Sequence, residues 1–471
     1  MLGRAGLREP SVRKNTRVVR LSRAAIGVAL LWTGACASEG APTGPSERAP
    51  AATADGVDPV PADDAAFLWD QNHLRTYEIL IDPEKLAEID GDPLAEAYVP
   101  ADLIFEGEHH RGVAVRYKGS LGTFAGCTAF DPDTGLVRKA CAKLSMKVRF
   151  NRNDRERRFH GLRKVQFHAM GRDPSMLRER LAYALFRSMG IAAPRAVHVR
   201  LMINGAFAGL FVLVEQIDGS FDRSRFADGG KGNLYKEIWP VWTDEAAYER
   251  ALKTNETDPE HNHDRVLRFG AALQDARDSR AVAALTAQWM DTAYLMRFIA
   301  VDRTLKHDDG MFHWYCGLEI GNNPHHCSNH NYYVYVERDA DQLWLIPWDL
   351  DHTFYGRSRS VHIPDAWNDL SVSCDPDDGI SRGPPACDKL TRGWAQFDDE
   401  YRSAVQLFID GPFADAPVMA DLDAWAAQIT PVIQEEAAAG LGPPVADWQR
   451  AVERLRTEIS KVRQLARDGL Q

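Results

Sequence analysis

Residues 342–356, QLWLIPWDLDHTFYG, contain the pattern that most constrains the fold. Apolar residues lead through Pro347 and Trp348 to two carboxylates, Asp349 and Asp351, that stand two positions apart. Alternation along a strand places residues i and i+2 on one side, so we expect both carboxylates at the C-terminal end of a strand. Two such oxygen ligands suit a hard cation such as Mg²⁺. On spacing alone, a structural alternative remains open, in which Asp349 caps a turn and Asp351 caps a helix.

The first 35 residues have the composition of an export signal. A basic stretch precedes a mostly apolar run, 24–35, that is too short to span a bilayer comfortably; its basic residues are Arg4, Arg8, Arg13, Lys14, Arg17, Arg20 and Arg23. Small residues then precede Cys36, an order that resembles the lipobox of bacterial lipoproteins. We therefore expect an exported protein, periplasmic or at the cell surface, whose membrane attachment is a lipid on Cys36. Ala37 favours the outer membrane over the inner one, and an ordinary signal peptide or an uncleaved anchor is the alternative.

Loss of this segment would leave a strongly acidic chain. The formal net charge is −11 at pH 7, and residues 1–35 contain seven basic residues and one acidic residue, so the remainder carries −17. A protein this acidic is unsuited to nonspecific binding of nucleic acid. Residues 36–65 are rich in Ala, Pro, Gly, Ser and Asp, which is typical of a flexible tether.

The cysteines agree with export to an oxidising compartment. Besides Cys36 there are six, in three close pairs: Cys127 and Cys141, Cys316 and Cys327, and Cys374 and Cys387. Six cysteines allow 15 connectivities, and pairing of nearest neighbours is the simplest of them. The alternative is zinc ligation, because residues 325–330 read HHCSNH, although the sequence contains no clean CxxC pair.

Residues 66–471 show no second linker and suit one α+β domain with two lobes. Short apolar runs between turn residues predict strands at 76–81, 98–105, 112–117, 143–150, 164–168, 196–203, 207–214 and 232–236. Asn204-Gly205 between two of these runs is a strong hairpin signal. Helical periodicity dominates later, at 281–295, 295–304, 401–409, 421–437 and 445–466. We expect a β-rich N-terminal lobe of about 66–216 and a mainly helical C-terminal lobe of about 217–471.

One helix is expected within the β-rich part. Asp173 is predicted to cap it, Pro174 to occupy its first position, and Gly190 to end it. Leu181 belongs to an apolar stripe along this helix. Glu179 lies off that stripe, so it is either an ordinary surface charge or the partner of a lysine.

Two segments of the β-rich part offer positive charge. The first, VRYKGSLGTF at 115–124, ends in a glycine-containing loop that could bring backbone N–H groups to a phosphate, with Arg116 and Lys118 as candidate contacts. A plain hairpin turn explains the glycines equally well. The second, KLSMKVRF at 143–150, alternates apolar and basic residues. Its basic side is either a solvated strand face or the source of a lysine directed at phosphate.

Several segments, taken in order, resemble the CotH family of spore-coat and secreted proteins. They are FHAMGRDPSMLRERLAYALFRSMGIAAPRAVHVRLMINGAFAGLFVLVEQID, GNLYK, HDDG, HNYYVY and LWLIPWDLDHTF, and the similarity covers roughly residues 75–440. CotH proteins are similar to atypical protein kinases. The resemblance implies a kinase-like fold, binding of ATP with Mg²⁺ or Mn²⁺, and phosphorylation of proteins, including the enzyme itself.

The resemblance also implies roles for acidic residues of the second half. Asp309 in HDDG corresponds to the catalytic carboxylate, and adjacent Asp308 remains open as the alternative. Asn331, which begins the Asn-Tyr-Tyr strand, corresponds to a metal ligand. Asp349 and Asp351 correspond to the Trp-Asp-x-Asp motif, and Asp349 is the better candidate for holding metal against the phosphates.

In the first half, the resemblance implies a lysine that contacts phosphate and a helix carboxylate that pairs with it. Lys147 or Lys143 is the candidate lysine, and Glu179 is the candidate carboxylate. Residues 215–218 occupy the place of an interlobe hinge, where the backbone could read adenine; the candidates there are Glu215, Gln216 and Ile217.

One departure from the family pattern leaves other functions open. Between Asp309 and Asn331 lie 21 residues, more than the resemblance leads us to expect. A disulfide-closed insertion beside the site could alter substrate access or disable catalysis. The alternative functions are therefore a non-catalytic surface or coat protein that binds a partner, and a metal-dependent hydrolase built on the Asp and His residues.

Overall fold

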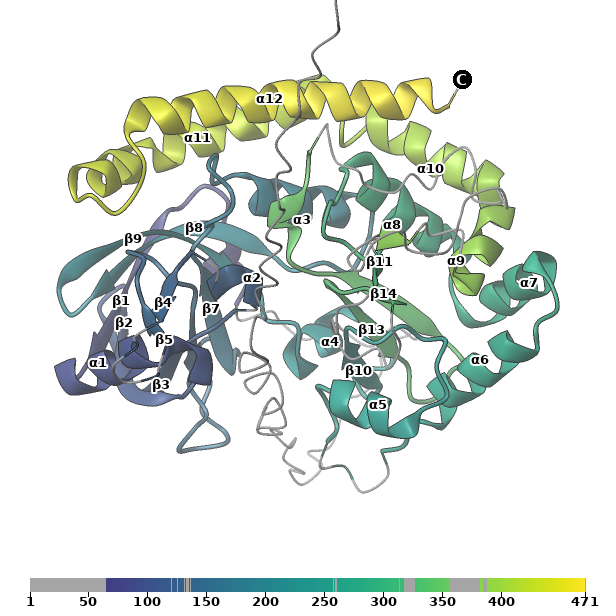
Figure 1. The fold of residues 1–471 in the computed structure, drawn as a ribbon, viewed down its shortest axis with the longest axis horizontal. Coiled ribbons are helices and arrows are strands. Elements are labelled where there is room, and N and C mark those ends of the chain that lie inside the picture. The colour runs from purple at the N-terminus through teal and green to yellow at the C-terminus, as the bar shows by residue number, and fades with distance from the viewer. Residues whose placement is uncertain are drawn as a thin grey trace, which may run out of the picture. The chain divides into compact units, whose positions relative to one another are not determined.

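The computed structural model describes residues 65–119, 121–124, 126–130, 132, 135, 137–256, 258, 261–312, 314–316, 327–355, 382–383 and 388–470 (Figure 1). These residues belong to one compact unit. The predicted signal segment, Cys36 and the tether up to residue 64 lie outside the described residues, as do Cys374 and Cys387. Among the helices that are described, none is both long and apolar enough to cross a bilayer.

Seven of the described strands close into a barrel in the order β1-β2-β3-β6-β7-β9-β8. They are β1 (Arg75–Ile81), β2 (Val99–Phe105), β3 (Glu108–Tyr117), β6 (Met146–Arg149), β7 (Lys164–His168), β8 (Ala196–Ile203) and β9 (Ala206–Val214). All neighbours are antiparallel except β1 and β8, which are parallel. Alternate side chains fill the interior, where the Tyr77 ring lies 4.6 Å from that of Phe105 and 5.3 Å from that of Phe167.

The predicted hairpin between β8 and β9 is confirmed. Asn204 and Gly205 both have positive φ, 51° and 78°, as a two-residue turn of this type requires. The Asn204 side chain also donates to the carbonyl of Ile81 at 2.8 Å and accepts from its N–H at 2.7 Å. The turn therefore holds β1 next to the hairpin.

The disulfide between Cys127 and Cys141 is confirmed. It joins the segments that carry β4 (Thr128–Phe130) and β5 (Val137–Lys139), a two-stranded sheet beside the barrel. The glycine-containing segment before it differs from the expectation, because Leu121–Phe124 forms a short helix, α2, and not an open loop.

Helix α3 (Arg178–Ser188) begins four residues later than Pro174, so the predicted start is wrong. Met176 has a φ of 60°, which interrupts any helix through this segment. Asp173 still caps the helix from a distance, because its carboxylate accepts from the N–H of Arg178 at 2.8 Å. The same carboxylate accepts from the N–H of Ser175 at 2.9 Å, which fixes the turn before the helix.

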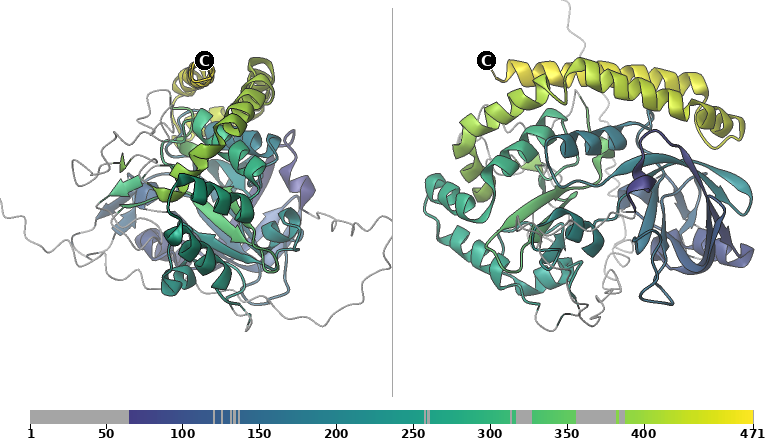
Figure 2. Two further views of the ribbon diagram at one scale, coloured as in Figure 1. Left: turned by 90° about the vertical axis from the view of Figure 1, so that its right-hand side faces the viewer. Right: turned by 180° about the vertical axis from the view of Figure 1, so that it is seen from behind.

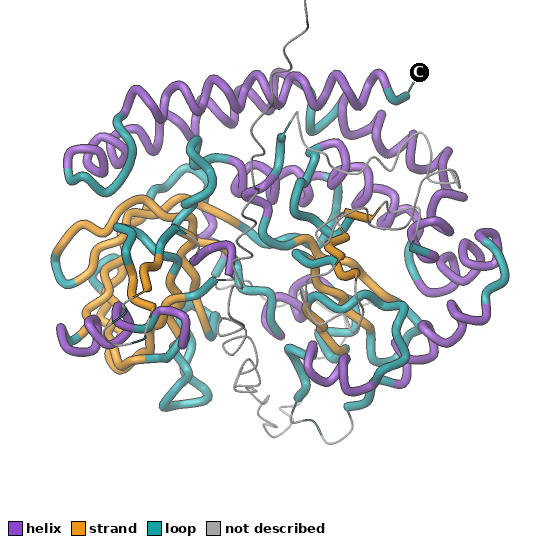
Figure 3. Tube along the Cα trace, in the orientation of Figure 1, coloured by secondary structure: helices purple, strands orange, loops and turns teal. Residues whose placement is uncertain are grey.

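The second part of the chain surrounds a small sheet with helices, as Figure 3 shows by the orange and purple segments. The sheet has the order β10-β13-β14, with strands β10 (Asn233–Lys236), β13 (Tyr332–Val336) and β14 (Leu343–Pro347). The helices are α4 (Gly219–Arg225), α5 (Glu245–Ala251), α6 (Asp264–Asp275), α7 (Ser279–Trp289), α8 (Thr292–Thr304), α9 (Lys389–Trp394), α10 (Asp398–Asp410), α11 (Asp415–Ala438) and α12 (Val445–Asp468). Figure 2 shows α11 and α12 side by side in both views. The α+β class is confirmed.

The predicted boundary between two helices at Leu295 is wrong. Helix α7 ends at Trp289, and Asp291 caps α8 by accepting from the N–H of Tyr294 at 2.9 Å. A capping aspartate satisfies a backbone donor that a continuous helix would otherwise use internally, so Asp291 marks the true start.

Strands β11 (Trp314–Cys316) and β12 (Cys327–Ser328) place Cys316 and Cys327 directly opposite each other. Directly paired residues of an antiparallel ladder have Cα atoms about 4.5–5.5 Å apart, which is within the range of a disulfide. We expect non-reducing peptide mapping to recover two linked pairs, Cys127–Cys141 and Cys316–Cys327. A free thiol at Cys316, or a crossed pair, would contradict this expectation.

Candidate functional site

Asp349 and Asp351, the two carboxylates of residues 342–356, do not lie on one strand face. Strand β14 ends at Pro347, Asp349 has a left-handed φ of 56°, and Asp351 lies in a 3₁₀ turn, Leu350–His352. The alternation argument is therefore wrong here, because the chain leaves the strand before the first aspartate. The two side chains nevertheless interact: burial raises the pKa of Asp351 well above its ordinary value, and the negative charge of Asp349 raises it further.

Backbone contacts on two sides hold Asp349 in place. Its N–H donates to the hydroxyl of Tyr183, on α3, at 3.1 Å. Its carbonyl accepts from Nε2 of His307 at 3.2 Å, and Nδ1 of His307 lies 3.2 Å from the Asp302 carboxylate. Burial alone would lower the pKa of His307, but the hydrogen bond with Asp302 raises it above the ordinary value. A protonated His307 donates to both oxygens at once.

The carboxylate of Glu179 contacts a histidine. Nδ1 of His168 lies 2.9 Å and 3.0 Å from the two Glu179 oxygens, and Nε2 of His168 lies 2.6 Å from Nζ of Lys118. Burial lowers the pKa of His168 well below its ordinary value, so the ring is neutral and bridges the lysine and the glutamate. Sequence reasoning named Lys118 and Glu179 but missed the histidine that connects them.

The two lysines of the 143–150 segment have separate surroundings. Lys143 forms an ion pair with Glu436 of α11, and its ammonium donates to the carbonyl of Leu210 at 3.0 Å. The predicted pairing of Lys143 with Glu179 is therefore wrong, since its charge is used by another helix. Its side chain is only 9% exposed, so the alternative of a solvated basic face is wrong for this residue as well.

Lys147 lies in a row of outward side chains on the barrel. It is the direct partner of Arg116 on β3 and of Gln166 on β7. Burial lowers the pKa of Lys147 well below its ordinary value, and the charges of Lys164 and Lys118 lower it further. Several cations are thus gathered on one barrel face, as an anion-binding surface requires.

An acidic side chain already occupies part of this basic face. Glu96 forms an ion pair with Arg116, and its carboxylate accepts from the N–H of Gly119 at 3.1 Å. The first backbone N–H of the predicted phosphate loop is therefore bonded to a carboxylate. The carboxylate of Glu96 is itself an oxyanion, so the position beside the Gly119 N–H can accommodate one.

Asp309 and Asn331 lie together in the structure. The Asn331 side-chain amide donates to the Asp309 carbonyl at 2.9 Å and to its carboxylate at 3.2 Å. The Asp309 carboxylate also accepts from the Tyr315 hydroxyl and contacts Nε2 of His330 at 3.1 Å. Burial would raise the pKa of Asp309, but the contacts with His330 and Tyr315 outweigh it and hold the pKa well below the ordinary value.

Asp349 links these groups electrostatically. It acts on Lys118 and Glu179 on one side and on Lys236 and His330 on the other. Lys236 was missed by sequence reasoning, although it ends the quoted segment GNLYK. Its ammonium lies 3.2 Å from the carboxylate of Glu237, which follows it directly.

Crowded carboxylates make the site suitable for a cation. Ligand atoms of His168, Glu179 and Asp349 all lie within 4.8 Å of one another. The pKa of Asp351 is raised first by burial and then by the charges of four acidic neighbours, Asp349, Glu179, Asp173 and Asp309. A divalent cation would relieve this repulsion, and the carboxylate oxygens of Asp349, Asp351 and Glu179 are ligands that suit a metal such as Mg²⁺.

The three hinge candidates differ in whether their side chains already have hydrogen-bond partners. The carboxylate of Glu215 accepts from Arg195 at 2.7 Å and Arg225 at 2.9 Å, and its N–H donates to the Arg195 carbonyl at 2.8 Å. The side chain of Ile217 is buried in the core. Oε1 of Gln216 and Oε1 of Gln166 are buried and make no hydrogen bond within the described structure, so polar groups of a ligand could satisfy them.

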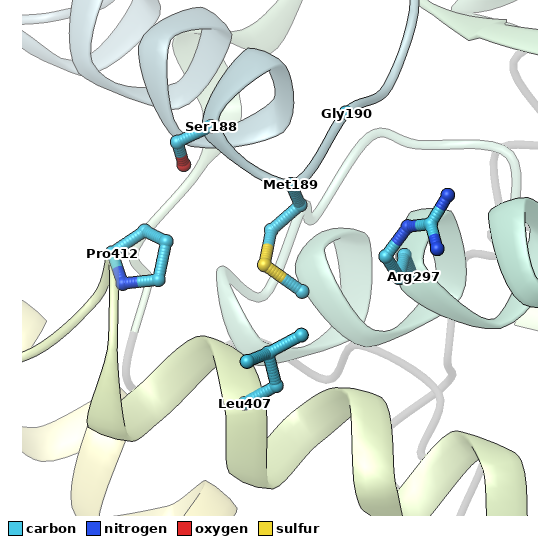
Figure 4. Close-up of a pocket in the computed structure, with 6 residues that line it drawn as sticks. All are labelled: Ser188, Met189, Gly190, Arg297, Leu407 and Pro412. Carbon is cyan, nitrogen blue, oxygen red and sulfur yellow. The ribbon is translucent and has the colours of Figure 1, made fainter.

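A pocket elsewhere in the molecule does not belong to this site. It has a volume of about 300 Å³ and is lined by Ser188, Met189, Gly190, Arg297, Leu407 and Pro412 (Figure 4). It lies at the C-terminal end of α3, whereas Glu179 lies in the first turn. At a rise of about 1.5 Å per residue, the length of the helix separates the two places.

Comparison with known proteins identifies the family. The family described as "CotH kinase protein" matches residues 115–465, which is more than half of the chain. The chain belongs to the CotH family. It is also similar to the inner spore coat protein H of Bacillus subtilis (strain 168), with 22% identity over 307 residues, 62% of this chain and 71% of that protein.

We predict that Lys143→Met destabilises the protein by about 3–5 kcal/mol, because it leaves the carboxylate of Glu436 buried without its cation. Glu436 is only 1% exposed. The double variant Lys143→Met, Glu436→Leu should recover much of the loss, and Lys461→Met, which changes an exposed lysine of α12, should cost about 0.5 kcal/mol or less. Urea unfolding checks all three. Equal losses for Lys143→Met and Lys461→Met would show that the ion pair is unimportant.

Proposed function

We propose that this CotH-family chain is an exported protein kinase that uses ATP and a divalent metal to phosphorylate protein hydroxyls, including its own. The observation that carries the proposal is that one neighbourhood contains Lys118, Glu179, Asp349 and the pair Asp309 and Asn331. Phosphoryl transfer depends on positioning and charge neutralisation, and these are the groups that it needs.

In this proposal the barrel is the N-terminal lobe of a kinase-like fold and the helical part is the C-terminal lobe. The outward row of Arg116 and Lys147, together with Lys118, would contact the phosphates. The segment 215–217 would be the hinge, where the open oxygens of Gln216 and Gln166 offer acceptors to the amino group of adenine. Export and lipid attachment at Cys36 remain predictions from the sequence.

The metal, Mg²⁺ or Mn²⁺, would be held by Asp349, Asp351 and Asn331, and would neutralise phosphate charge. Asp309 would orient the attacking hydroxyl. Its lowered pKa keeps it ionised at neutral pH, so it can accept the hydrogen bond of that hydroxyl. It is a weak base, which suits a reaction in which bond breaking to the leaving group dominates the transition state.

A second candidate function is non-catalytic binding of a protein partner at a surface or coat. Two observations favour it. The relative from Bacillus subtilis is named as a spore coat protein. Glu179 also contacts His168, which bridges it to Lys118, whereas the resemblance implies a direct pair of Glu179 with Lys147 or Lys143. Nucleotide turnover decides between the two functions.

We expect the purified chain to transfer label from γ-labelled ATP to itself in the presence of Mg²⁺ or Mn²⁺. Asp349→Asn should nearly abolish the transfer and weaken metal binding, because an amide oxygen is a poorer ligand than a carboxylate. Asp309→Asn should retain nucleotide and metal binding while turnover falls about 10²–10⁴-fold, which is typical of a positioned acid–base group.

Asp339→Asn is the matched control, because Asp339 is an exposed aspartate in the turn between β13 and β14. If Asp349 and Asp309 were only structural caps, their replacement should cost about 1 kcal/mol or less, without selective loss of activity. Melting temperature, nucleotide binding and autophosphorylation should be measured for all variants. Full autophosphorylation by Asp349→Asn would show that Asp349 is not a metal ligand needed for phosphoryl transfer.

A pH dependence follows from Lys118. Burial lowers its pKa to about 8, against the opposing effect of Asp349 and Glu179. Phosphate prefers the charged ammonium, so the affinity for metal-free ATP should fall as the pH rises above about 8, by up to about tenfold per unit. Fluorescent-nucleotide titrations from about pH 7.5 to about pH 9.5 test this. Lys118→Arg stays charged throughout and should lose the dependence; a flat profile in the unchanged protein would exclude Lys118 as a phosphate contact.

A further inference from the structure

Three metal-ligand side chains meet away from the site described above. Glu249 lies on α5, and His261 and His263 lie just before α6. Nε2 of His263 is 2.8 Å and Nε2 of His261 is 3.4 Å from the same oxygen of Glu249. All three ligand atoms lie within 4.8 Å of one another. We infer that these residues form a structural zinc site that is independent of the proposed nucleotide site.

The second nitrogen of each histidine has an oxygen partner. Nδ1 of His261 lies 2.7 Å from the carbonyl of Asp258, which can only accept, so Nδ1 carries the proton. Nδ1 of His263 lies 2.8 Å from the hydroxyl of Tyr235, which can also accept. Partners of this kind fix the rings and leave both Nε2 atoms to face a cation, an arrangement that metal-ligating histidines usually have.

The distances suit tetrahedral coordination. Two ligand atoms about 2.0–2.1 Å from a tetrahedral zinc are about 3.3 Å apart. The 3.4 Å separation of His261 and Glu249 agrees with this value. The 2.8 Å separation of His263 and Glu249 must widen by about 0.5 Å. Glu249 can make this adjustment, because its side chain is 56% exposed.

The ligand types favour zinc over magnesium. Two imidazoles and one carboxylate suit Zn²⁺, whereas Mg²⁺ prefers oxygen ligands alone. A fourth position would be filled by water. In the absence of metal, the same groups can form histidine–glutamate ion pairs. The pKa of His261 is raised by its hydrogen bond to Asp258 and also by Glu249, while burial acts in the opposite direction. Metal binding is the alternative, and it uses the Nδ1 proton of His261 that the Asp258 carbonyl fixes.

A metal here would tie the connection between α5 and α6 to the small sheet. Tyr235, which orients His263, belongs to β10 and is buried. The amide of Asn233, on the same strand, donates to the carbonyl of Asn262 at 2.9 Å, between the two histidines. A metal bound by Glu249, His261 and His263 would therefore hold these three residues against β10, which is a structural role.

A second group of possible metal ligands consists of Glu108, His110 and His160, whose ligand atoms also lie within 4.8 Å of one another. Nε2 of His160 makes no hydrogen bond in the described structure, although it lies 3.4 Å from Glu108. Any zinc bound there is a separate equivalent, so the test must count the metal that depends on Glu249 and His261.

The test uses the full chain, purified in detergent, treated with chelator and titrated with Zn²⁺ by calorimetry. His261→Ala and Glu249→Gln should each weaken one equivalent at least about 10–100-fold, whereas Glu245→Gln, on the exposed side of α5, should not change it. His261 is 22% exposed and Glu249 is 56% exposed, so these changes spare the buried His263. Equal zinc stoichiometry and affinity in all variants would overturn the proposal.

Cobalt spectroscopy compares the unchanged chain with His261→Ala, so that bands from this site are distinguished from any that arise at Glu108, His110 and His160. Co²⁺ in this site should give the intense visible bands of tetrahedral coordination, and excess Zn²⁺ should remove them. Only the weak bands of octahedral cobalt would overturn the proposal. Zinc should also raise the melting temperature of the unchanged chain, because it binds the folded state, and should raise that of His261→Ala less.

Discussion

The first turn of α3 buries three consecutive charged side chains, and much of the structure is arranged around them. Arg178, Glu179 and Arg180 are 6%, 4% and 1% exposed. An unpaired charge buried in this way costs several kcal/mol, so each of the three must find a partner. The partners lie in different elements, and α3 consequently connects the barrel with the helices.

The three charged side chains of this turn contact different elements of the structure. Arg178 donates to Glu458 of α12 at 2.5 Å and to the carbonyl of Thr353. Glu179 contacts His168 at the end of β7. Arg180 reaches the N-terminal segment, β8 and α11; its partners are Gln71 at 3.0 Å, His198 at 2.8 Å and Gln428 at 2.8 Å. The carboxylate is therefore held at the candidate site by a turn that the two arginines anchor.

Local signals in the sequence predicted the elements whose structure is decided locally. The Asn204-Gly205 turn and the long helix from Val445 follow from turn chemistry and periodicity. The start of α3 and the placement of Asp349 do not, because each depends on a non-glycine residue with positive φ, Met176 or Asp349, which periodicity does not reveal. The bridge through His168 joins residues 118, 168 and 179, and no spacing rule connects positions so far apart.

The unusually long segment between Asp309 and Asn331 raised the question of whether it disables the site. The structure shows that it supplies two of the contacts of Asp309. Tyr315 on β11 and His330 after β12 both bond to its carboxylate. Tyr315 stands beside Cys316, which is paired across the ladder with Cys327, so a disulfide there would hold the tyrosine in position. These contacts lower the pKa of Asp309 and keep it ionised. The described part of the segment therefore contributes two contacts to the carboxylate on which the proposed phosphoryl transfer would depend.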